Sequence, residues 1–262
     1  PMTVLLPEGE VWVTQEQPLP RVTQTELEQL CDIVTGYSRY ASSDTLAQGY
    51  LTAPGGFRVG LCGTAVVREG TSRNLRDLSS AWIRIGREQE GLCRELWPAL
   101  WENGRFCATV LLSPPGLGKT TLLRDMVRTL SDGTSDYPAL RVAVVDERGE
   151  IAGMYRGAPQ LAVGCHTDVL DGCPKALGIP VLLRAANPQV IAVDEITQRE
   201  DLYAVSAAVN CGVTLLATIH AGSREELRRK PLFARLLRLQ VFERAVLITR
   251  QNGERRYQVE RL

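Results

Sequence analysis

A loop rich in glycine and proline, followed by a lysine and two threonines, could bind the phosphates of a nucleotide. It stands in the segment VLLSPPGLGKTTLLRD, residues 110–125. In such a loop consecutive backbone N–H groups converge on the anion, while the lysine and the N-terminus of the next helix supply positive charge. The segment matches the pattern G-x-x-x-x-G-K-[ST], except that Ser113 replaces the first glycine. Ser113 restricts the backbone at the entrance of the loop but removes no ligand, so we expect a weakened or merely variant loop, not a dead one.

The positions of this loop have distinct expected tasks. Gly116 and Gly118 can adopt the backbone conformations that bring the chain close to phosphates. Lys119 is placed to reach the β- and γ-phosphates, and the hydroxyl of Thr120 to bind Mg²⁺. A strand-to-helix turn with a fortuitous lysine is the disfavoured alternative, because an apolar strand precedes the loop and a helix follows it. The residues expected to contact the nucleotide are Ser113, Pro114, Pro115, Gly116, Leu117, Gly118, Lys119, Thr120 and Thr121.

An acidic pair ends the apolar segment VIAVDE, residues 190–195. Asp194 could hold magnesium through its water shell, and Glu195 could position and activate an attacking water. Such a pair alone is common at strand ends. Together with the phosphate loop upstream it indicates hydrolysis of a nucleoside triphosphate.

Two further apolar segments also end in polar side chains. VAVVDERGE, residues 142–150, supplies Glu147, and ATIHA, residues 217–221, supplies Thr218 and His220. In an open parallel sheet the ligand binds beyond the carboxyl ends of the strands, so these side chains are expected at one edge. We predict catalytic roles for Glu147, Glu195 and His220. His220 could sense the γ-phosphate or hydrogen-bond a catalytic carboxylate, and equally it could be a satisfied histidine at a strand end.

The segments that must position these residues indicate an α/β domain. Near-continuous apolar runs alternate with helical stretches, which is typical of a mostly parallel sheet covered on both faces. A final hairpin is expected at Asn252-Gly253, between residues 244–251 and 254–261. The runs predicted as strands are 107–113, 140–146, 189–195 and 212–220.

The first hundred residues have a different pattern and are expected to form a small α+β domain. A helix is predicted at residues 25–37, an antiparallel meander at 49–70 and a second helix at 91–101. We therefore expect an N-terminal domain at residues 1–103 and a phosphate-loop domain at residues 104–262.

Composition narrows the class of protein further. Of 262 residues 44% are hydrophobic and 23% charged, which is ordinary for a globular protein, and the formal net charge is zero. Zero net charge argues against nucleic acid as a direct partner. The basic stretch at residues 228–240 is better interpreted as a solvated amphipathic helix. The seven cysteines form no C-x-x-C pair, and no apolar run approaches the ~20 residues of a membrane span. We expect a soluble cytoplasmic protein, or the soluble arm of something larger.

The order of these motifs resembles the secretion ATPases of type II and type IV systems, whose Asp and His boxes VVDERGE and ATIHA would match. The chain resembles more closely the stage III sporulation protein AA family of endospore-forming bacteria. This resemblance covers about residues 30 to 250. It rests on GGFRVGLCGTAV, PPGLGKTTLLRD, AVVDERGEIAG, GAPQLAVGCHTDVLDGCPKA and VIAVDEITQREDLYA.

The resemblance implies a RecA-like P-loop core that uses ATP and Mg²⁺. It also implies a homo-oligomer, as a hexameric ring, that energises a channel complex between mother cell and forespore. The protein would act from the mother-cell cytoplasm on integral-membrane partners. In secretion ATPases the N-terminal domain supplies arginines toward a neighbouring nucleotide, a role that Arg84 could fill, with Arg58 and Arg87 as weaker candidates. Ser113 and His166 depart from the family pattern.

Two other functions remain open beside an ATP-hydrolysing motor. An ATP-binding assembly scaffold with little turnover would not need a water-activating acid, so Glu195 favours the enzyme. A nucleic-acid-associated P-loop ATPase is disfavoured by the zero net charge. A GTPase is less favoured still, because no N-K-x-D segment is found to recognise guanine.

Overall fold

The computed structural model describes residues 3–6, 9–13, 21–37, 49–68, 71–86, 88–251 and 253–262. The chain divides into an N-terminal unit, residues 1–86, and a C-terminal unit, residues 87–262. This boundary falls earlier than the expected one after residue 103. The reason is that Cys93, Leu96, Trp97 and Leu100 pack into the core of the C-terminal unit.

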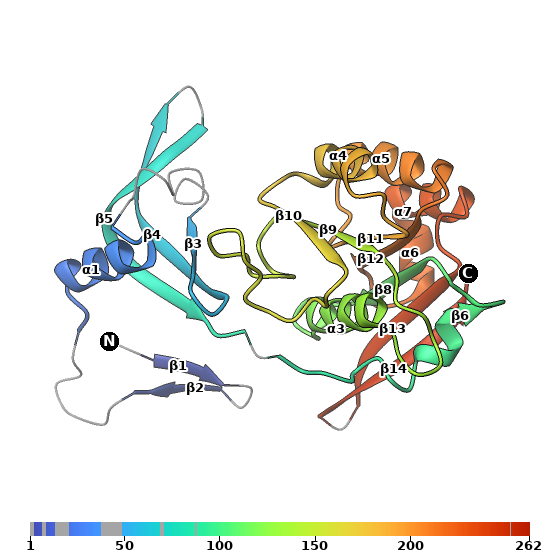
Figure 1. Ribbon diagram of the computed structural model, residues 1–262. Helices are drawn as coiled ribbons and strands as arrows, with labels where there is room; N and C mark the ends of the chain where they lie inside the picture. The colour runs from blue at the N-terminus through green and yellow to red at the C-terminus, as the bar shows by residue number, and fades with distance from the viewer. Residues whose placement is uncertain are drawn as a thin grey trace. The chain divides into compact units, whose positions relative to one another are not determined.

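The N-terminal unit contains a helix on a three-stranded antiparallel sheet. A helix and an antiparallel meander were expected here, but the third strand lies at residues 71–84, beyond the expected meander at 49–70. Thr23 caps the helix in a reciprocal capping box with Glu26. The apolar face of the helix, with Leu27 and Cys31, packs on Val59 and its neighbours in the sheet. The elements are β1 (Thr3–Leu6), β2 (Gly9–Trp12), α1 (Gln24–Val34), β3 (Tyr50–Ala53), β4 (Phe57–Arg68) and β5 (Thr71–Arg84), with β1 and β2 forming a separate hairpin (Figure 1).

The C-terminal unit is built on a seven-stranded sheet in the order β10-β9-β11-β12-β8-β13-β14. The strands from β10 to β13 run parallel, and β14 pairs antiparallel with β13 at one edge. The predicted mostly parallel α/β sheet is thus confirmed, and the last two strands have their predicted bounds, although Asn252 lies outside the described residues. The strands are β8 (Thr109–Ser113), β9 (Val142–Asp146), β10 (Thr167–Asp171), β11 (Val190–Val193), β12 (Thr214–His220), β13 (Arg244–Gln251) and β14 (Glu254–Arg261).

Helices cover both faces of this sheet (Figure 1). Side chains alternate along each strand, so Leu111 packs with α3 on one face while Val110 and Leu112 pack with the helices on the other. Burial on both faces explains why the strands read as continuous apolar runs. The helices are α3 (Lys119–Asp132) on the first face, and α4 (Lys175–Ala185), α5 (Arg199–Asn210), α6 (Arg224–Arg229) and α7 (Pro231–Arg238) on the second.

The helix predicted at residues 91–101 is wrong. The structure has turns followed by a 3₁₀ helix, η1 (Trp97–Leu100), and a small hairpin of β6 (Trp101–Glu102) and β7 (Arg105–Phe106). A carboxylate on α3, Asp125, accepts the N–H groups of Gly91 and Cys93, each at 2.9 Å, and holds this segment as turns. Pro98 would also lack the N–H that a helix through this position requires.

The basic stretch at residues 228–240 forms two short helices rather than one. Helix α6 ends at Arg229, and Pro231 occupies the first turn of α7, where its missing N–H is not needed. In the described parts of the chain no helix is both long and apolar enough to cross a bilayer.

Candidate nucleotide-binding site

Strand β8 leads directly into the phosphate loop at the carboxyl edge of the sheet. Gly116 and Gly118 have φ of 79° and 90°, the left-handed region that favours glycine. Gly118 caps α3 without a side-chain hydrogen bond, so the first N–H groups of α3 can bind an anion. Ser113 lies outside the left-handed region, which explains why serine is accommodated where the motif has glycine.

Lys119 is held by its own loop. Its side chain is buried, and Nζ donates to the carbonyl oxygens of Ser113 and Pro114 at 3.1 and 3.2 Å and to Ser113 Oγ at 3.3 Å. Nζ also lies 2.7 Å from Nδ1 of His220. Burial lowers the pKa of Lys119, while the nearby carboxylates of Glu195 and Asp194 raise it. The lysine must therefore exchange these contacts for phosphate oxygens when a nucleotide enters.

His220 connects this lysine to the candidate water-activating acid. A lysine ammonium can only donate, so Nδ1 of His220 accepts and the ring proton is assigned to Nε2. Nε2 then donates to the carboxylate of Glu195. The second oxygen of this carboxylate accepts from Arg148 at 3.3 Å. Glu195 also has φ of 39°, a strained value for a residue other than glycine, and such strain concentrates at functional sites.

Asp194 and Thr120 lie together as a magnesium pair should. Thr120 Oγ1 donates to Asp194 Oδ2 at 2.9 Å, and the hydroxyl of Thr218 donates to the other oxygen of the same carboxylate. Thr218 also accepts the backbone N–H of Glu195 at 2.9 Å. Among the described residues no group of three or more His, Cys, Asp or Glu side chains gathers as a metal cage. A hard cation here would use one carboxylate, one hydroxyl, water and phosphate oxygens, which suits Mg²⁺.

Glu147 was expected beside the nucleotide, but its partner lies elsewhere. It forms an ion pair with Lys175, a buried residue at the start of α4. The adjacent Asp146 is buried and accepts three backbone N–H groups of residues 150–152, at 2.9, 3.1 and 2.8 Å. Burial raises the pKa of Asp146, and these hydrogen bonds oppose the increase. The structure thus brings Lys119, Thr120, Asp194, Thr218, Glu195 and His220 together, and it pairs Glu147 elsewhere.

Arg255 is a residue of the site that was not predicted from the sequence. Its guanidinium lies so close to Gly118 that a Cβ built there would meet its carbon at 3.0 Å. Arg255 Nη1 also donates to Gln89 Oε1 at 3.3 Å. The hairpin of β13 and β14 thus carries a cation to the phosphate loop. No local motif marks this arginine, because its position depends on the pairing of β13 with β8. Lys175 and Arg148 were missed as well, although both lie inside segments that carry the family resemblance.

The remaining expected residues are divided between the two units. Pro114, Pro115 and Gly116 form the exposed tip of the loop, and Leu117 and Thr121 are partly buried. Arg84 ends β5 in the N-terminal unit, Arg58 stacks on the ring of Tyr50 at 3.9 Å, and Arg87 lies outside the described residues. The role of Arg84 toward a nucleotide therefore stays a prediction.

A phosphate loop that joins a buried parallel strand to a helix, with a Thr–Asp pair beside it, defines a RecA-like P-loop fold. A solved structure of the pilus retraction motor PilT with bound ADP has a TM-score of 0.63 and 15% identity, and covers 99% of this chain and 75% of that one. The ATPase DotB of Legionella pneumophila has a TM-score of 0.54 and 18% identity, over 92% and 69% of the two chains. These likenesses are of fold.

The family model "Sporulation stage III, protein AA" matches residues 1–259, and the chain belongs to this family. It is 40% identical over 220 residues to the stage III sporulation protein AA of Bacillus subtilis (strain 168), which covers 84% of this chain and 71% of that protein. It is 34% identical over 131 residues to the uncharacterized protein ycf45 of Porphyra purpurea, covering 49% and 22% of the two. The predicted resemblance to this sporulation family is confirmed.

Proposed function

We propose that the chain is a Mg²⁺-dependent ATPase that works as a motor in sporulation. The observation that carries the proposal is the contact chain from Lys119 through His220 to Glu195. It connects a phosphate-binding lysine with an acid placed to activate water, beside the Thr120–Asp194 pair. A protein that only bound ATP would not need this acid.

The phosphates of ATP would bind to the N–H groups of the loop and of the first turn of α3. Lys119 releases the carbonyl groups of its own loop and donates to the phosphates, and Arg255 adds positive charge beside Gly118. Thr120 and Asp194 would hold Mg²⁺. When bound, this ion neutralises charge on the phosphate oxygens.

Glu195 acts as the base that orients the attacking water and accepts its proton. His220 and Arg148 fix the two oxygens of its carboxylate, and Thr218 fixes its backbone. His220 also contacts Lys119, so this contact can change when the lysine moves from its own loop to the phosphates. Glu147 would act on the same site after leaving Lys175.

The motor is proposed to work as a ring of identical chains, with six subunits as the expected number. In such a ring Arg84 of one copy stabilises charge on the nucleotide of its neighbour, as arginines do in other phosphoryl-transfer sites. The proposed partners are integral-membrane proteins of a channel between mother cell and forespore, and the chain would act from the mother-cell cytoplasm. Membership of the sporulation family and the fold of the motor PilT support this part.

The test is steady-state phosphate release with Mg–ATP across a range of protein concentrations. We expect turnover that rises steeply with protein concentration and disappears in Lys119→Ala and Glu195→Gln. A fluorescent ATP analogue, added to the same samples, separates binding from chemistry: Glu195→Gln should still bind it, and Lys119→Ala should bind it weakly. If the wild type binds the analogue but releases no more phosphate than Glu195→Gln, an assembly scaffold replaces the motor.

A further inference from the structure

A cavity of about 820 Å³ lies in the C-terminal unit, away from the phosphate loop. It is lined by α6, α7, the segment that leads into β13, the end of β14, and Glu102 of β6. Arg244, in its wall, pairs in register with Thr109 at the start of β8, whereas the phosphate loop follows Ser113 at the end of that strand. The wall formed by Arg244 therefore lies at the opposite edge of the sheet from the phosphate loop. The wall formed by α6 begins four residues after His220, which ends β12.

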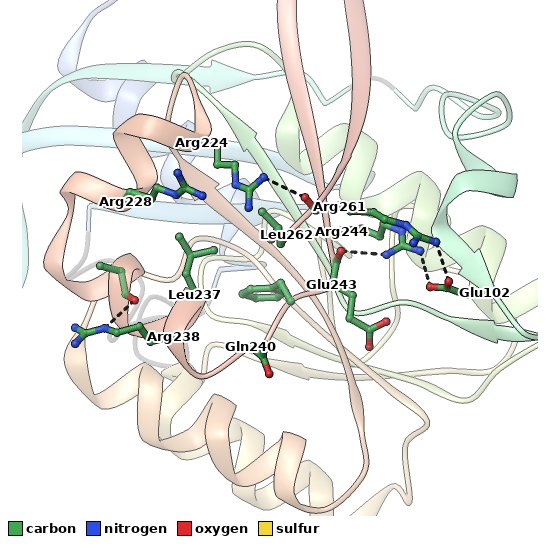
Figure 2. Close-up of a pocket in the computed structure, with 12 residues that line it drawn as sticks. Glu102, Arg224, Arg228, Leu237, Arg238, Gln240, Glu243, Arg244, Arg261 and Leu262 are labelled. Atoms are coloured by element: carbon green, nitrogen blue, oxygen red, sulfur yellow. Dashed lines mark hydrogen bonds and ion pairs between the residues drawn. The ribbon is translucent and has the colours of Figure 1, made fainter.

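Arginines dominate the wall of this cavity, and its carboxylates are already paired. Glu102 accepts from Arg244 at 2.8 Å and from Arg261 at 2.7 Å (Figure 2). Glu243 forms two hydrogen bonds of 2.9 Å with Arg105, which lies outside the cavity lining. Neither carboxylate is left to neutralise the other arginines of the wall.

Three arginines of the wall form no ion pair within the described residues: Arg224 and Arg228 of α6, and Arg238 of α7. Glu225 of α6 interacts electrostatically with Arg224 and Arg228 but does not line the cavity. Arg224 Nη1 donates to the backbone oxygen of Arg261 at 3.2 Å, and its Nε is buried without an acceptor. Arg238 donates to a carbonyl oxygen of its own helix at 3.3 Å. Arg224 and Arg228 are four residues apart on α6 and therefore lie on one face of it. Figure 2 shows both beside the cavity, across from Glu102.

The wall between these charged groups is apolar. Leu237 of α7, Phe242 and Leu262 line the cavity and pack on the core of the sheet. A ligand that fills the cavity thus meets cations and, between them, aliphatic and aromatic carbon. Such a surface suits a ligand with acidic groups and apolar groups together.

We propose that this cavity binds an acidic segment of a partner protein. Carboxylates of the segment pair with Arg224 and Arg228, and an aliphatic side chain contacts Leu237 and Leu262, which are partly exposed. Guanidinium groups favour carboxylates because two parallel N–H groups match the two oxygens. The partner could bind without blocking the nucleotide, because none of the residues that line the cavity belongs to the nucleotide site.

Other anionic partners fit this wall less well. Single strands of nucleic acid bind on exposed aromatic side chains, whereas Phe242, the aromatic residue that lines the cavity, is buried. An anionic membrane favours a flat or convex basic surface, and these arginines surround a concavity. Charge and shape together therefore favour a peptide.

The proposal can be tested by fluorescence anisotropy with the full chain. The probe is a short fluorescein-labelled peptide in which glutamate and leucine alternate, titrated at low and at physiological ionic strength. We expect Arg228→Gln to weaken binding by about fivefold and the double variant Arg224→Gln, Arg228→Gln by more than about tenfold, since each removes a charge-assisted hydrogen bond. A peptide with serine in place of leucine should bind more weakly to the wild type. None of these readouts requires ATP hydrolysis, so they stand apart from the proposed motor function.

Arg229→Gln is the matched control, because Arg229 is exposed on the same helix and does not line the cavity. It should change the affinity by less than about twofold, as expected for a solvated charge. The proposal is overturned if the wild type does not bind the peptide, or if Arg229→Gln weakens binding as much as Arg228→Gln. It is also overturned if a single-stranded oligonucleotide or vesicles of anionic phospholipid bind more tightly than the peptide through Arg224 and Arg228.

Discussion

Two neighbouring strands of the sheet lead into the same three residues, which have different surroundings. The triplet Val-Asp-Glu stands at residues 145–147, where β9 ends at Asp146, and at residues 193–195, where β11 ends at Val193. The strands are parallel, and Val145 pairs in register with Val193, so the two acidic pairs occupy equivalent places at the sheet edge. The difference between them therefore arises from the loop after each strand and from the elements packed around it.

The first aspartate is held by its own loop and the second by other elements. Asp146 is buried and accepts N–H groups from residues 150–152 of the loop that follows it. Asp194 accepts hydroxyl groups from Thr120 on α3 and Thr218 on β12. The first arrangement fixes the course of a loop. The second leaves an aspartate beside the phosphate loop with oxygens bonded to hydroxyls that a cation could displace.

The largest expected effect separates the two glutamates. Glu195→Gln should lower turnover by at least about 100-fold, because a positioned base contributes roughly 10²–10⁴. Glu147→Gln should lower turnover by only about tenfold. The loss is smaller because Glu147 is paired with Lys175 rather than with the residues at the phosphate loop. Phosphate release at saturating Mg–ATP measures both. Equal losses in the two variants would show that Glu147 contributes as much to the reaction as Glu195, and would remove the distinction.

The second effect concerns stability. Here the substitution after β9, at Asp146, is expected to cost more than the substitution after β11, at Asp194. Asp146→Ala leaves three backbone N–H groups without their acceptor, so we expect the free energy of unfolding to fall by about 2–4 kcal/mol. Asp194→Ala should lower it by at most about 1 kcal/mol while it abolishes Mg²⁺-dependent turnover. Urea unfolding followed by circular dichroism measures the difference. Asp146→Asn, which keeps one acceptor oxygen, should lie between wild type and Asp146→Ala.

The sequence predicts the elements of this site well and their partners poorly. Apolar strands and the glycine loop leave local patterns, so the mostly parallel sheet and the course of residues 110–125 could be predicted. The two Val-Asp-Glu triplets could not be told apart, because the N–H groups around Asp146 and the hydroxyls around Asp194 belong to the folded loop and to neighbouring elements.

Contacts between distant segments account for the other differences. The helix predicted at residues 91–101 is replaced by turns because the carboxylate of Asp125, on α3, accepts hydrogen bonds from the N–H groups of Gly91 and Cys93. Arg255 reaches Gly118 only because β13 adds to the sheet beside β8. Neither contact leaves a periodic or compositional signal in the chain.

A smaller effect is expected from the hydroxyl that connects Asp194 with Glu195. Thr218 is fully buried, and its hydroxyl donates to Asp194 and accepts the N–H of Glu195 at 2.9 Å. Among the described hydrogen bonds of Asp146, none comes from a hydroxyl group. Thr218→Val keeps the shape and removes the hydroxyl, so we expect about tenfold lower turnover and a loss of about 1 kcal/mol in the free energy of unfolding.

The matched control for this variant is Thr109→Val, on β8. Thr109 is also fully buried, and its hydroxyl donates to the carbonyl oxygen of Cys107 at 2.7 Å, at the other edge of the sheet. The control should lose similar stability and keep its turnover. A similar loss of turnover in both variants would mean that Thr218 acts only through stability.

The smallest expected effect concerns Arg148, which follows the first triplet and contacts the second. Its guanidinium lies 3.3 Å from Glu195, but its side chain is 59% exposed, and exposed ion pairs contribute little to stability. Arg148→Ala should therefore leave the free energy of unfolding within about 0.5 kcal/mol of wild type and lower turnover about two- to threefold, since Glu195 still has His220. Arg184→Ala, an exposed arginine on α4, should change neither. If Arg148→Ala instead lowers turnover as far as Glu195→Gln does, the loop after β9 is part of the catalytic site, and the two strand ends act as one unit.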